Sequence, residues 1–281
     1  MLSSDLISKY KKPLTPLPTN LKPGGKLKKK VRCLLFDIYG TLFVSGSGDI
    51  GIAKKESQQI DKLKNLLLKF GVSAPPQTVL HKLFSTIEKT HDSLRKEGVD
   101  FPEVVIERIW MRVLENDDDE LVKAFAAEFE LIVNPVYPMP NLQNMLSACK
   151  ELNIVMGVIS NAQFYTTYLF NWFLSADMKD FGFHPDLIFY SYKFGYAKPS
   201  TFLFRMAAER LKNRNIQAHS VLYIGNDVLN DIYPAKTVGF STALFAGDAR
   251  SLRLREDDPT CKNFSADIVI TDLIQILDYV Q

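Results

Sequence analysis

The chain has 281 residues, of which 46% are hydrophobic and 23% are charged, and its formal net charge is +2. This composition is ordinary for a globular protein, and it excludes wholesale disorder, a collagen-like chain and a small disulfide framework. The length suffices for one large domain or for a core domain that carries a smaller insertion. A net charge so close to zero indicates no special partner.

Residues 1–29 are rich in proline, lysine and glycine, which predicts an extended or partly disordered arm. Basic residues gather at 26–32, but no aromatic platform or recognition helix accompanies them, so we expect no nucleic-acid partner. The sequence contains neither a signal-peptide pattern nor an apolar run long enough for a membrane span, and we expect a soluble, cytoplasmic protein. Cys33, Cys149 and Cys261 are widely separated, so neither disulfides nor a zinc site are indicated.

The first strong structural signal is the apolar run VRCLLFD at residues 31–37, which is typical of a strand buried on both faces of a parallel sheet. A turn-rich stretch follows it. From about residue 53 to 132, apolar residues recur three and four positions apart, and glycines and prolines divide the pattern into successive helices. A proline-rich joint at 134–141 closes this block. We therefore predict a helical cap at 51–134, inserted after the first strand.

After the joint, helical and strand-like segments alternate to the end of the chain. Strands are predicted at 154–160, 187–191, 220–226, 241–245 and 266–271, with helices between most of them and a closing helix near the C-terminus. The alternation predicts a doubly wound α/β core with a parallel sheet, formed by residues 30–50 and 135–281. In such a core, ligands bind beyond the carboxyl ends of the strands.

Three of the predicted strands end in polar, potentially reactive residues. Asp37 follows the first strand, Ser160 and Asn161 follow the second, and Asn226 and Asp227 follow a later one. Because the carboxyl ends of parallel strands lie at one edge of the sheet, we expect these side chains to converge on one crevice.

Four segments in order resemble the motifs of the haloacid dehalogenase-like superfamily. These are FDIYGTL, VISNA, the Lys198-Pro199 pair within GYAKPSTFLF, and IGNDVLND. One such motif alone is a weak signal, but four in the right order on the right elements are specific, and the resemblance covers about residues 31–275. The helical block between the first and second motifs stands where this family carries a helical cap.

The resemblance implies a hydrolase that uses an aspartate nucleophile. Asp37 is then the residue that forms an aspartyl-enzyme intermediate, and Ser160 donates a hydrogen bond to the anionic group of a small substrate. Asn161 shapes the loop after the second strand, and Thr41 with Gly40 completes the turn beside the nucleophile. We expect Tyr39, Thr41 and Asn161 to contact the substrate. Lys198 places a positive charge beside the nucleophile and the transition state.

The fourth motif departs from the family pattern, in which an acidic residue commonly follows the glycine. Here Asn226 takes that position, followed by Asp227 and, four residues further on, Asp231. Either Asn226 replaces an acid and Asp231 remains, or Asp227 and Asp231 form the acidic pair. Mg²⁺ often takes only one or two carboxylates and several waters, so Asp37, the Tyr39 carbonyl and either remaining acid suffice as ligands.

The first motif departs as well, because phosphatases of this superfamily carry a second aspartate two residues after the nucleophile, as general acid and base. This chain has Tyr39 there, as in the 2-haloacid dehalogenase form of the motif, and a tyrosine with its ordinary pKa near 10 is a poor acid. Loss of such an acid typically costs about 10²- to 10⁴-fold in rate, unless the leaving group needs little protonation. However, the dehalogenase form also has an arginine soon after the motif, which is missing here.

These features leave three functions open. The first choice is a Mg²⁺-dependent phosphatase of a small phosphorylated metabolite, because Asp227 and Asp231 preserve carboxylates for a metal. The second is a 2-haloacid dehalogenase, and the third is a binding or regulatory protein on the same scaffold. Residues 45–48 serve equally well as an anion-binding turn or a cap hinge. An aromatic cluster at 164–173 indicates core or homodimer packing rather than substrate contact.

Overall fold

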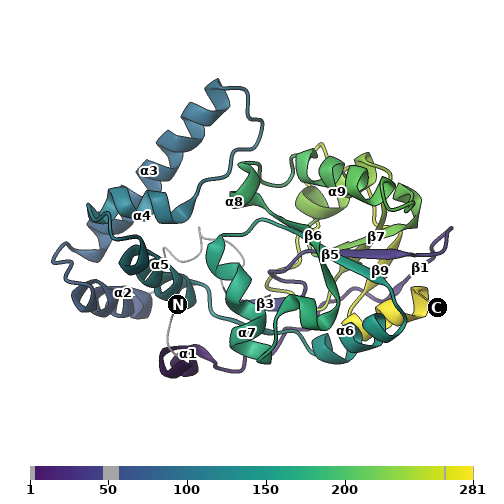
Figure 1. The fold of residues 1–281 in the computed structure, drawn as a ribbon, viewed down its shortest axis with the longest axis horizontal. Coiled ribbons are helices and arrows are strands. Elements are labelled where there is room, and N and C mark those ends of the chain that lie inside the picture. The colour runs from purple at the N-terminus through teal and green to yellow at the C-terminus, as the bar shows by residue number, and fades with distance from the viewer. Residues whose placement is uncertain (1–3, 47–56, 263, 281) are drawn as a thin grey trace.

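The structure is a computed structural model that describes residues 4–46, 57–262 and 264–280. A seven-stranded sheet forms its centre, in the order β1-β9-β8-β7-β2-β5-β6, and all neighbouring strands are parallel except the β1–β9 pair (Figure 1). The strands are β1 (Gly24–Gly25), β2 (Cys33–Phe36), β5 (Val155–Ser160), β6 (Phe183–Tyr190), β7 (Val221–Gly225), β8 (Ser241–Phe245) and β9 (Ile268–Ile270). The predicted α/β core with a parallel sheet is thus confirmed.

The central strand β2 is buried on both faces because its side chains alternate between two packed layers. Leu34 and Phe36 belong to the apolar cluster that includes α6 (Leu142–Glu151) and the 3-10 helix η6 (Leu273–Tyr279). Cys33 and Leu35 face the opposite cluster, which includes α9 (Phe202–Lys212) and α10 (Tyr233–Thr237). An apolar strand without polar alternation follows from this arrangement, since neither face meets water.

The helical insertion lies to one side of the sheet and consists of α2 (Ser57–Lys69), α3 (Pro76–Lys96), α4 (Ile106–Leu114) and α5 (Asp119–Val133) (Figure 1). Its own core is aromatic. Trp110 is 1% exposed, and its ring centroid lies 4.8 Å from those of both Phe125 and Phe129 in edge-on contacts. Such contacts add to the hydrophobic gain from burial, so the four helices hold together as one cap.

The two connections between core and cap pair with each other, which the sequence analysis did not predict. Residues Phe43–Ser45 form β3 and Val136–Pro138 form β4, and the two make a short antiparallel ribbon. The amide of Gly46 continues it by donating to the carbonyl of Pro135 at 2.8 Å. Proline and glycine suggested only turns here, but an edge ribbon of three residues tolerates both.

Residues 4–30 contain one short helix and the short strand β1, and they are bound to both parts of the molecule. The helix α1 (Ser4–Tyr10) contacts the cap through Tyr10, whose hydroxyl donates to Glu128 of α5 at 3.0 Å. Further along, the amide of Leu17 donates to Asp248 at 2.9 Å, and the hydroxyl of Thr19 donates to the carbonyl of Ala246 at 2.8 Å. β1 then joins the sheet edge.

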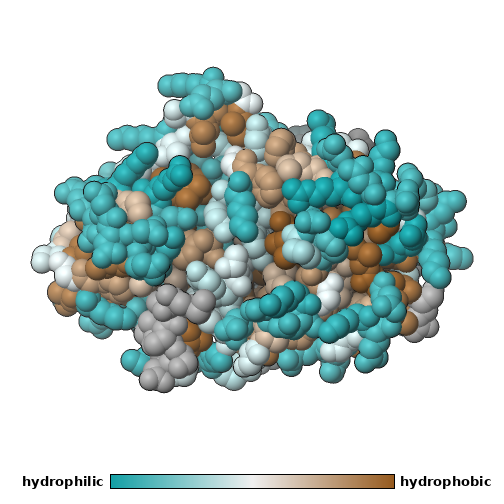
Figure 2. Space-filling view, in the orientation of Figure 1, coloured by the Kyte–Doolittle hydropathy of each residue, from teal (hydrophilic) through white to brown (hydrophobic). Residues whose placement is uncertain are grey.

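Hydrophilic residues cover most of the face drawn in Figure 2, with smaller hydrophobic areas between them. The remaining helical segments are η2 (Phe164–Tyr168), α7 (Leu169–Leu174), η3 (Met178–Phe181), α8 (Ser191–Phe194), η4 (Ala218–Ser220) and a π-helical turn η5 (Val228–Ile232). Within the part of the chain that the structure describes, no helix is both long and apolar enough to cross a lipid bilayer.

Asp267 ties β8 to the start of β9, and its contribution to stability depends on pH. Partial burial alone would raise its pKa, but hydrogen bonds from Lys236 at 2.8 Å and from the amide and hydroxyl of Thr242 outweigh that effect and lower it. A lowered folded-state pKa gives a contribution that is complete at neutral pH and lost as the pH falls below about 4.

We therefore expect Asp267→Asn to lower the free energy of unfolding by about 1 kcal/mol at pH 7, a modest value because the site is partly exposed. The difference from wild type should disappear near pH 3. Urea unfolding followed by circular dichroism at the two pH values checks this. Asp278→Asn, at an exposed position, is the control, and an equal loss at both pH values would contradict the assignment.

Candidate active site

The predicted site residues meet at the carboxyl ends of the adjacent strands β7, β2 and β5. There they line a cavity of about 390 Å³, to which both the core and the cap contribute side chains. Lys198 joins them from the loop after β6 and α8. Of the residues predicted from the motifs, the cavity is lined by Asp37, Tyr39, Asn161, Lys198, Asn226, Asp227 and Asp231.

The ammonium group of Lys198 lies between two buried carboxylates. Its Nζ donates to Oδ1 of Asp37 at 2.8 Å and to Oδ1 of Asp231 at 2.5 Å, and the three side chains are 3%, 10% and 1% exposed. Burial alone would lower the pKa of Lys198, but the two carboxylates raise it to about 12. The lysine therefore remains charged beside the nucleophile position.

Asp231 is held in place by a dense set of hydrogen bonds. Besides Lys198, its Oδ1 lies 2.9 Å from the hydroxyl of Tyr223, and its Oδ2 accepts from the amide of Asp227 at 3.0 Å. Burial raises the pKa of Asp231 to about 6, although the Lys198 ammonium acts to lower it. The glycine before the motif is required for this approach, because a Cβ on Gly225 would lie 2.3 Å from Cγ of Asp231.

The carboxylate of Asp227 is used structurally. It accepts from the amides of Leu229 and Asn230 at the start of η5, and it forms a two-point ion pair with Arg255 at 3.1 and 2.6 Å. These donors occupy both of its oxygens. Asp227 is thus a helix cap as well as a cavity residue.

Asn226 is fixed through both ends of its amide. Its Oδ1 accepts from the hydroxyl of Thr41 at 3.1 Å, and its Nδ2 donates to the carbonyl of Ser251 at 2.5 Å. Gly40 lies close by with φ of +79°, where a Cβ would come within 2.8 Å of Nδ2 of Asn226. The turn after Asp37 therefore needs glycine for its backbone conformation and for space.

Mg²⁺ prefers oxygen ligands, so the fit of such an ion depends on which oxygens remain. Across residues 4–46, 57–262 and 264–280, no three acidic, histidine or cysteine side chains are grouped so that they could hold a metal. The carboxylate oxygens of Asp227 and Asp231 are already bound by Arg255, Lys198 and backbone amides, so neither is counted among the oxygens open to a metal. The oxygens left are those of Asp37, the Tyr39 carbonyl and the Asn226 amide. They fit a Mg²⁺ ion that has one protein carboxylate and is completed by water and substrate.

Two residues predicted to act on substrate do not reach the cavity. Ser160 and Thr41 are completely buried and do not line the described cavity, since Ser160 remains within β5 and Thr41 turns back to Asn226. Asn161 lines the cavity and also grips the lysine loop. Its side chain accepts from the amide of Lys198 at 2.7 Å and donates to the carbonyl of the same residue at 3.2 Å.

Tyr39 lines the cavity where a second acid was missing. Its hydroxyl lies 2.8 Å from that of Thr166. Burial and the nearby carboxylate of Glu130 raise the pKa of Tyr39 well above its ordinary value. The tyrosine is therefore neutral at every ordinary pH and does not replace the missing aspartate as an acid.

Sequence reasoning missed the residues that the cap and a distant loop add to the cavity, among them Glu103, Glu130, Ser251, Arg253 and Arg255. The arginines bring the positive charge that the segment after the first motif lacks, but no motif spacing connects them to Asp37. The hydroxyl of Ser251 is buried and has no hydrogen-bond partner within the described chain, so a ligand can use it. Glu130 did carry a signal, since it interrupts the apolar run around it.

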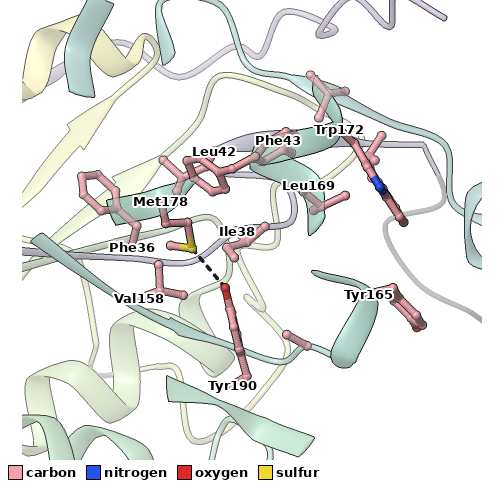
Figure 3. Close-up of a cluster of buried hydrophobic side chains, with 14 of the residues drawn as sticks. Phe36, Ile38, Leu42, Phe43, Val158, Tyr165, Leu169, Trp172, Met178 and Tyr190 are labelled. Carbon is pink, nitrogen blue, oxygen red and sulfur yellow. Dashed lines mark hydrogen bonds between the residues drawn. The ribbon is translucent and has the colours of Figure 1, made fainter. Parts of the chain in front are cut away.

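The aromatic cluster at 164–173 packs mainly in the core (Figure 3). The ring centroid of Phe170 lies 5.5 Å from those of both Phe43 and Phe183. Tyr165 is different because it also lines the cavity, and its hydroxyl donates to Glu130 at 3.0 Å. In the segment 45–48, Ser47 and Gly48 lie outside the described residues, whereas Ser45 and Gly46 extend the ribbon between core and cap.

Residues 31–239 match the sequence pattern of the haloacid dehalogenase-like hydrolases, which is most of the chain. The chain belongs to this family. An uncharacterised hydrolase of Schizosaccharomyces pombe is 24% identical over 231 residues, which cover 75% of this chain and 88% of that protein. The family assignment agrees with the resemblance of the four motifs.

Solved structures of the family have the same fold. A 2-haloacid dehalogenase from Pseudomonas syringae superposes with a TM-score of 0.55 at 19% identity, over 89% of this chain and 98% of that one. A phosphatase of the same family from Thermococcus onnurineus gives 0.52 at 16% identity, over 89% and 97%. At such identities the likeness concerns the fold, and it includes the helical insertion after the first strand.

The arrangement around Lys198 predicts a large and pH-dependent effect of its removal. In Lys198→Met two carboxylates share a buried site without a cation, so we expect the free energy of unfolding to fall by about 3–5 kcal/mol at pH 8. The loss should be smaller at pH 5, because the carboxylates bind a proton more readily without the ammonium, which lowers the pKa of Asp231, and the proton relieves their repulsion. Urea unfolding at pH 8 and pH 5 measures both.

The control is Lys123→Met, which removes an exposed pair with Asp119 one helical turn away and should cost less than about 1 kcal/mol at either pH. Equal losses for the two lysine variants would refute the central role of Lys198 in holding the site together.

Proposed function

We propose that this hydrolase uses Asp37 as a nucleophile and removes a phosphoryl group from a small anionic metabolite. The observation that carries the proposal is the Lys198 ammonium at 2.8 Å from Oδ1 of Asp37, which leaves the second oxygen of Asp37 without a hydrogen bond within the described chain. A carboxylate held by one oxygen and desolvated in a cavity is oriented for attack through the other.

In the first step an oxygen of Asp37 attacks phosphorus, the bond to the leaving oxygen breaks, and an acyl phosphate forms on Asp37. In the second step water attacks phosphorus, the bond to Asp37 breaks, and inorganic phosphate leaves. Lys198 and the cavity arginine Arg253 provide positive charge against the developing negative charge. Asp37, the Tyr39 carbonyl and the Asn226 amide would hold Mg²⁺, which when bound offsets the charge of the phosphoryl group.

Removal of halide from a 2-haloacid is the second candidate, and Tyr39 is the observation that favours it. A halide leaves without a proton, so this reaction needs no acid at the position that the neutral tyrosine occupies. Arg253 would offer charge for the substrate carboxylate.

Assays of the purified protein against phosphate esters, acyl phosphates and 2-chloropropionate, with and without Mg²⁺, separate the two reactions. We expect release of inorganic phosphate that increases with Mg²⁺. Chloride release without metal would replace the phosphatase proposal by the dehalogenase one. Tight anion binding without any turnover would instead support a binding or regulatory protein.

Asp37→Asn should lower kcat on the best substrate by about a thousandfold or more, because an amide oxygen is a poor nucleophile. Steady-state kinetics measures this, and circular dichroism verifies the fold. Asp61→Asn, at an exposed position on α2, is the control and should retain activity. Retained activity in Asp37→Asn would rule out the covalent mechanism.

Asn226→Asp should strengthen metal binding by about tenfold or more, since it adds a second carboxylate to an oxygen set that has one. Titration with Mn²⁺ followed by electron paramagnetic resonance measures the dissociation constant without reference to activity. Asn144→Asp adds the same charge at an exposed position on α6 and should leave the constant unchanged. An equal change in both variants would show that Asn226 does not face the metal.

A further inference from the structure

Glu130 stands where two cavities meet. It lines the catalytic cavity together with Asp37 and Tyr39, and it also lines a smaller cavity of about 60 Å³ inside the cap. Except for Glu130 and the Tyr165 hydroxyl, the side chains around the smaller cavity are apolar, among them Leu80, Leu83 and Trp110. If a substrate placed its anionic group at Asp37 and a short apolar group in the cap cavity, the bond that joins the two groups would lie beside Glu130.

The surroundings of Glu130 favour a neutral carboxyl group. It accepts from the side-chain amide of Asn134 and from the hydroxyl of Tyr165, both at 3.0 Å, and no ion pair with it is found in the described chain. It lies in the last turn of α5, which holds no basic residue and where the helix dipole is negative. Burial raises the pKa of Glu130, against the effect of these two donors.

Glu103, the other cap carboxyl in the cavity, is bound differently. One of its oxygens accepts from the amide of Val104 and from Gln163, and the other accepts from the hydroxyl of Ser191 at 2.7 Å. These three hydrogen bonds occupy both oxygens of Glu103 and fix its side chain in place. Glu130 accepts from two donors, one on each oxygen, so fewer hydrogen bonds fix it to the scaffold.

A proton donor on the cap would complete a site that lacks one on the core. Tyr39, at the position of the missing aspartate, is neutral and bound to Thr166. Asp37, Tyr39 and Glu130 line the same cavity, so a cap carboxyl shares the space in which the ester bond would break.

We propose that Glu130 is the general acid for the leaving group, and that this group is an alcohol with a short apolar chain seated in the cap cavity. The proposal rests on the phosphatase function proposed above. As Asp37 attacks phosphorus and the ester bond breaks, the carboxyl proton of Glu130 passes to the leaving oxygen and gives the neutral alcohol. The resulting carboxylate then takes a proton from the attacking water, which restores the acid as phosphate is released.

The test compares two leaving groups, because only one of them needs a proton. Ethyl phosphate releases a strongly basic alkoxide, whereas acetyl phosphate releases acetate, which is stable as an anion. In Glu130→Gln we expect kcat/KM to fall about 10²- to 10⁴-fold for ethyl phosphate and less than about tenfold for acetyl phosphate. Glu130→Asp, which retains an acid, should recover part of the loss. Glu103→Gln is the matched control, and it should change kcat/KM by the same factor for both substrates.

The outcomes separate this inference from the function on which it rests. If acetyl phosphate hydrolysis requires Asp37 but Glu130→Gln affects both substrates equally, or neither, the role of Glu130 is overturned and the phosphatase function stands. If wild type hydrolyses neither compound, both fall.

The apolar chain is tested by comparing butyl with ethyl phosphate. Wild type should have the lower KM for butyl phosphate, and Leu80→Phe, which fills the cap cavity, should remove that preference. Equal KM values in wild type would overturn the apolar half of the proposal.

Discussion

The structure of the site depends on one cation between two buried carboxylates. Burying Asp37 and Asp231 together without Lys198 would place two like charges in a poorly solvated space, which is among the costliest arrangements in a protein. With the lysine present, both acids are oriented, and one oxygen of Asp37 is left for chemistry. Asn161 holds the lysine loop through two hydrogen bonds, so the position of the charge is set by the strand next to the nucleophile.

Around this centre the backbone is shaped by residues without side chains. Gly225 allows Asp231 to approach its strand, and Gly40 allows the turn after the nucleophile to lie against Asn226. The departures from the family pattern are accommodated within the same frame. Asn226 forms hydrogen bonds with Thr41 and Ser251, and Tyr39 forms one with Thr166, so the polar atoms of both unusual side chains have partners. In the role proposed for it, Glu130 supplies from the cap the proton donor that the core lacks at Tyr39.

The α/β core, the polar residues at the ends of its strands and the helical cap could be predicted from the sequence, because buried strands, helical spacing and ordered motifs are local signals. The grouping of Asp37 with Asn161, Asn226 and Asp227 followed from the rule that parallel strands end at one edge, whereas Lys198 and Asp231 followed from the resemblance of the motifs. Arg253, Arg255 and Glu130 could not be placed in this way, because they reach the cavity through loop and cap packing. The ion pair of Asp227 with Arg255 and the hydrogen bond from Thr41 to Asn226 could not be predicted either, because a sequence does not show which partner a side chain contacts.

The N-terminal arm gives the cap a third attachment. The two chain connections between core and cap run through the β3–β4 ribbon. The arm contacts the cap helix α5 through Tyr10 and contacts the core through Leu17 and Thr19. Because the arm is anchored to both parts, any displacement of the cap away from the core would have to extend residues 11–16 or break the hydrogen bond between Tyr10 and Glu128.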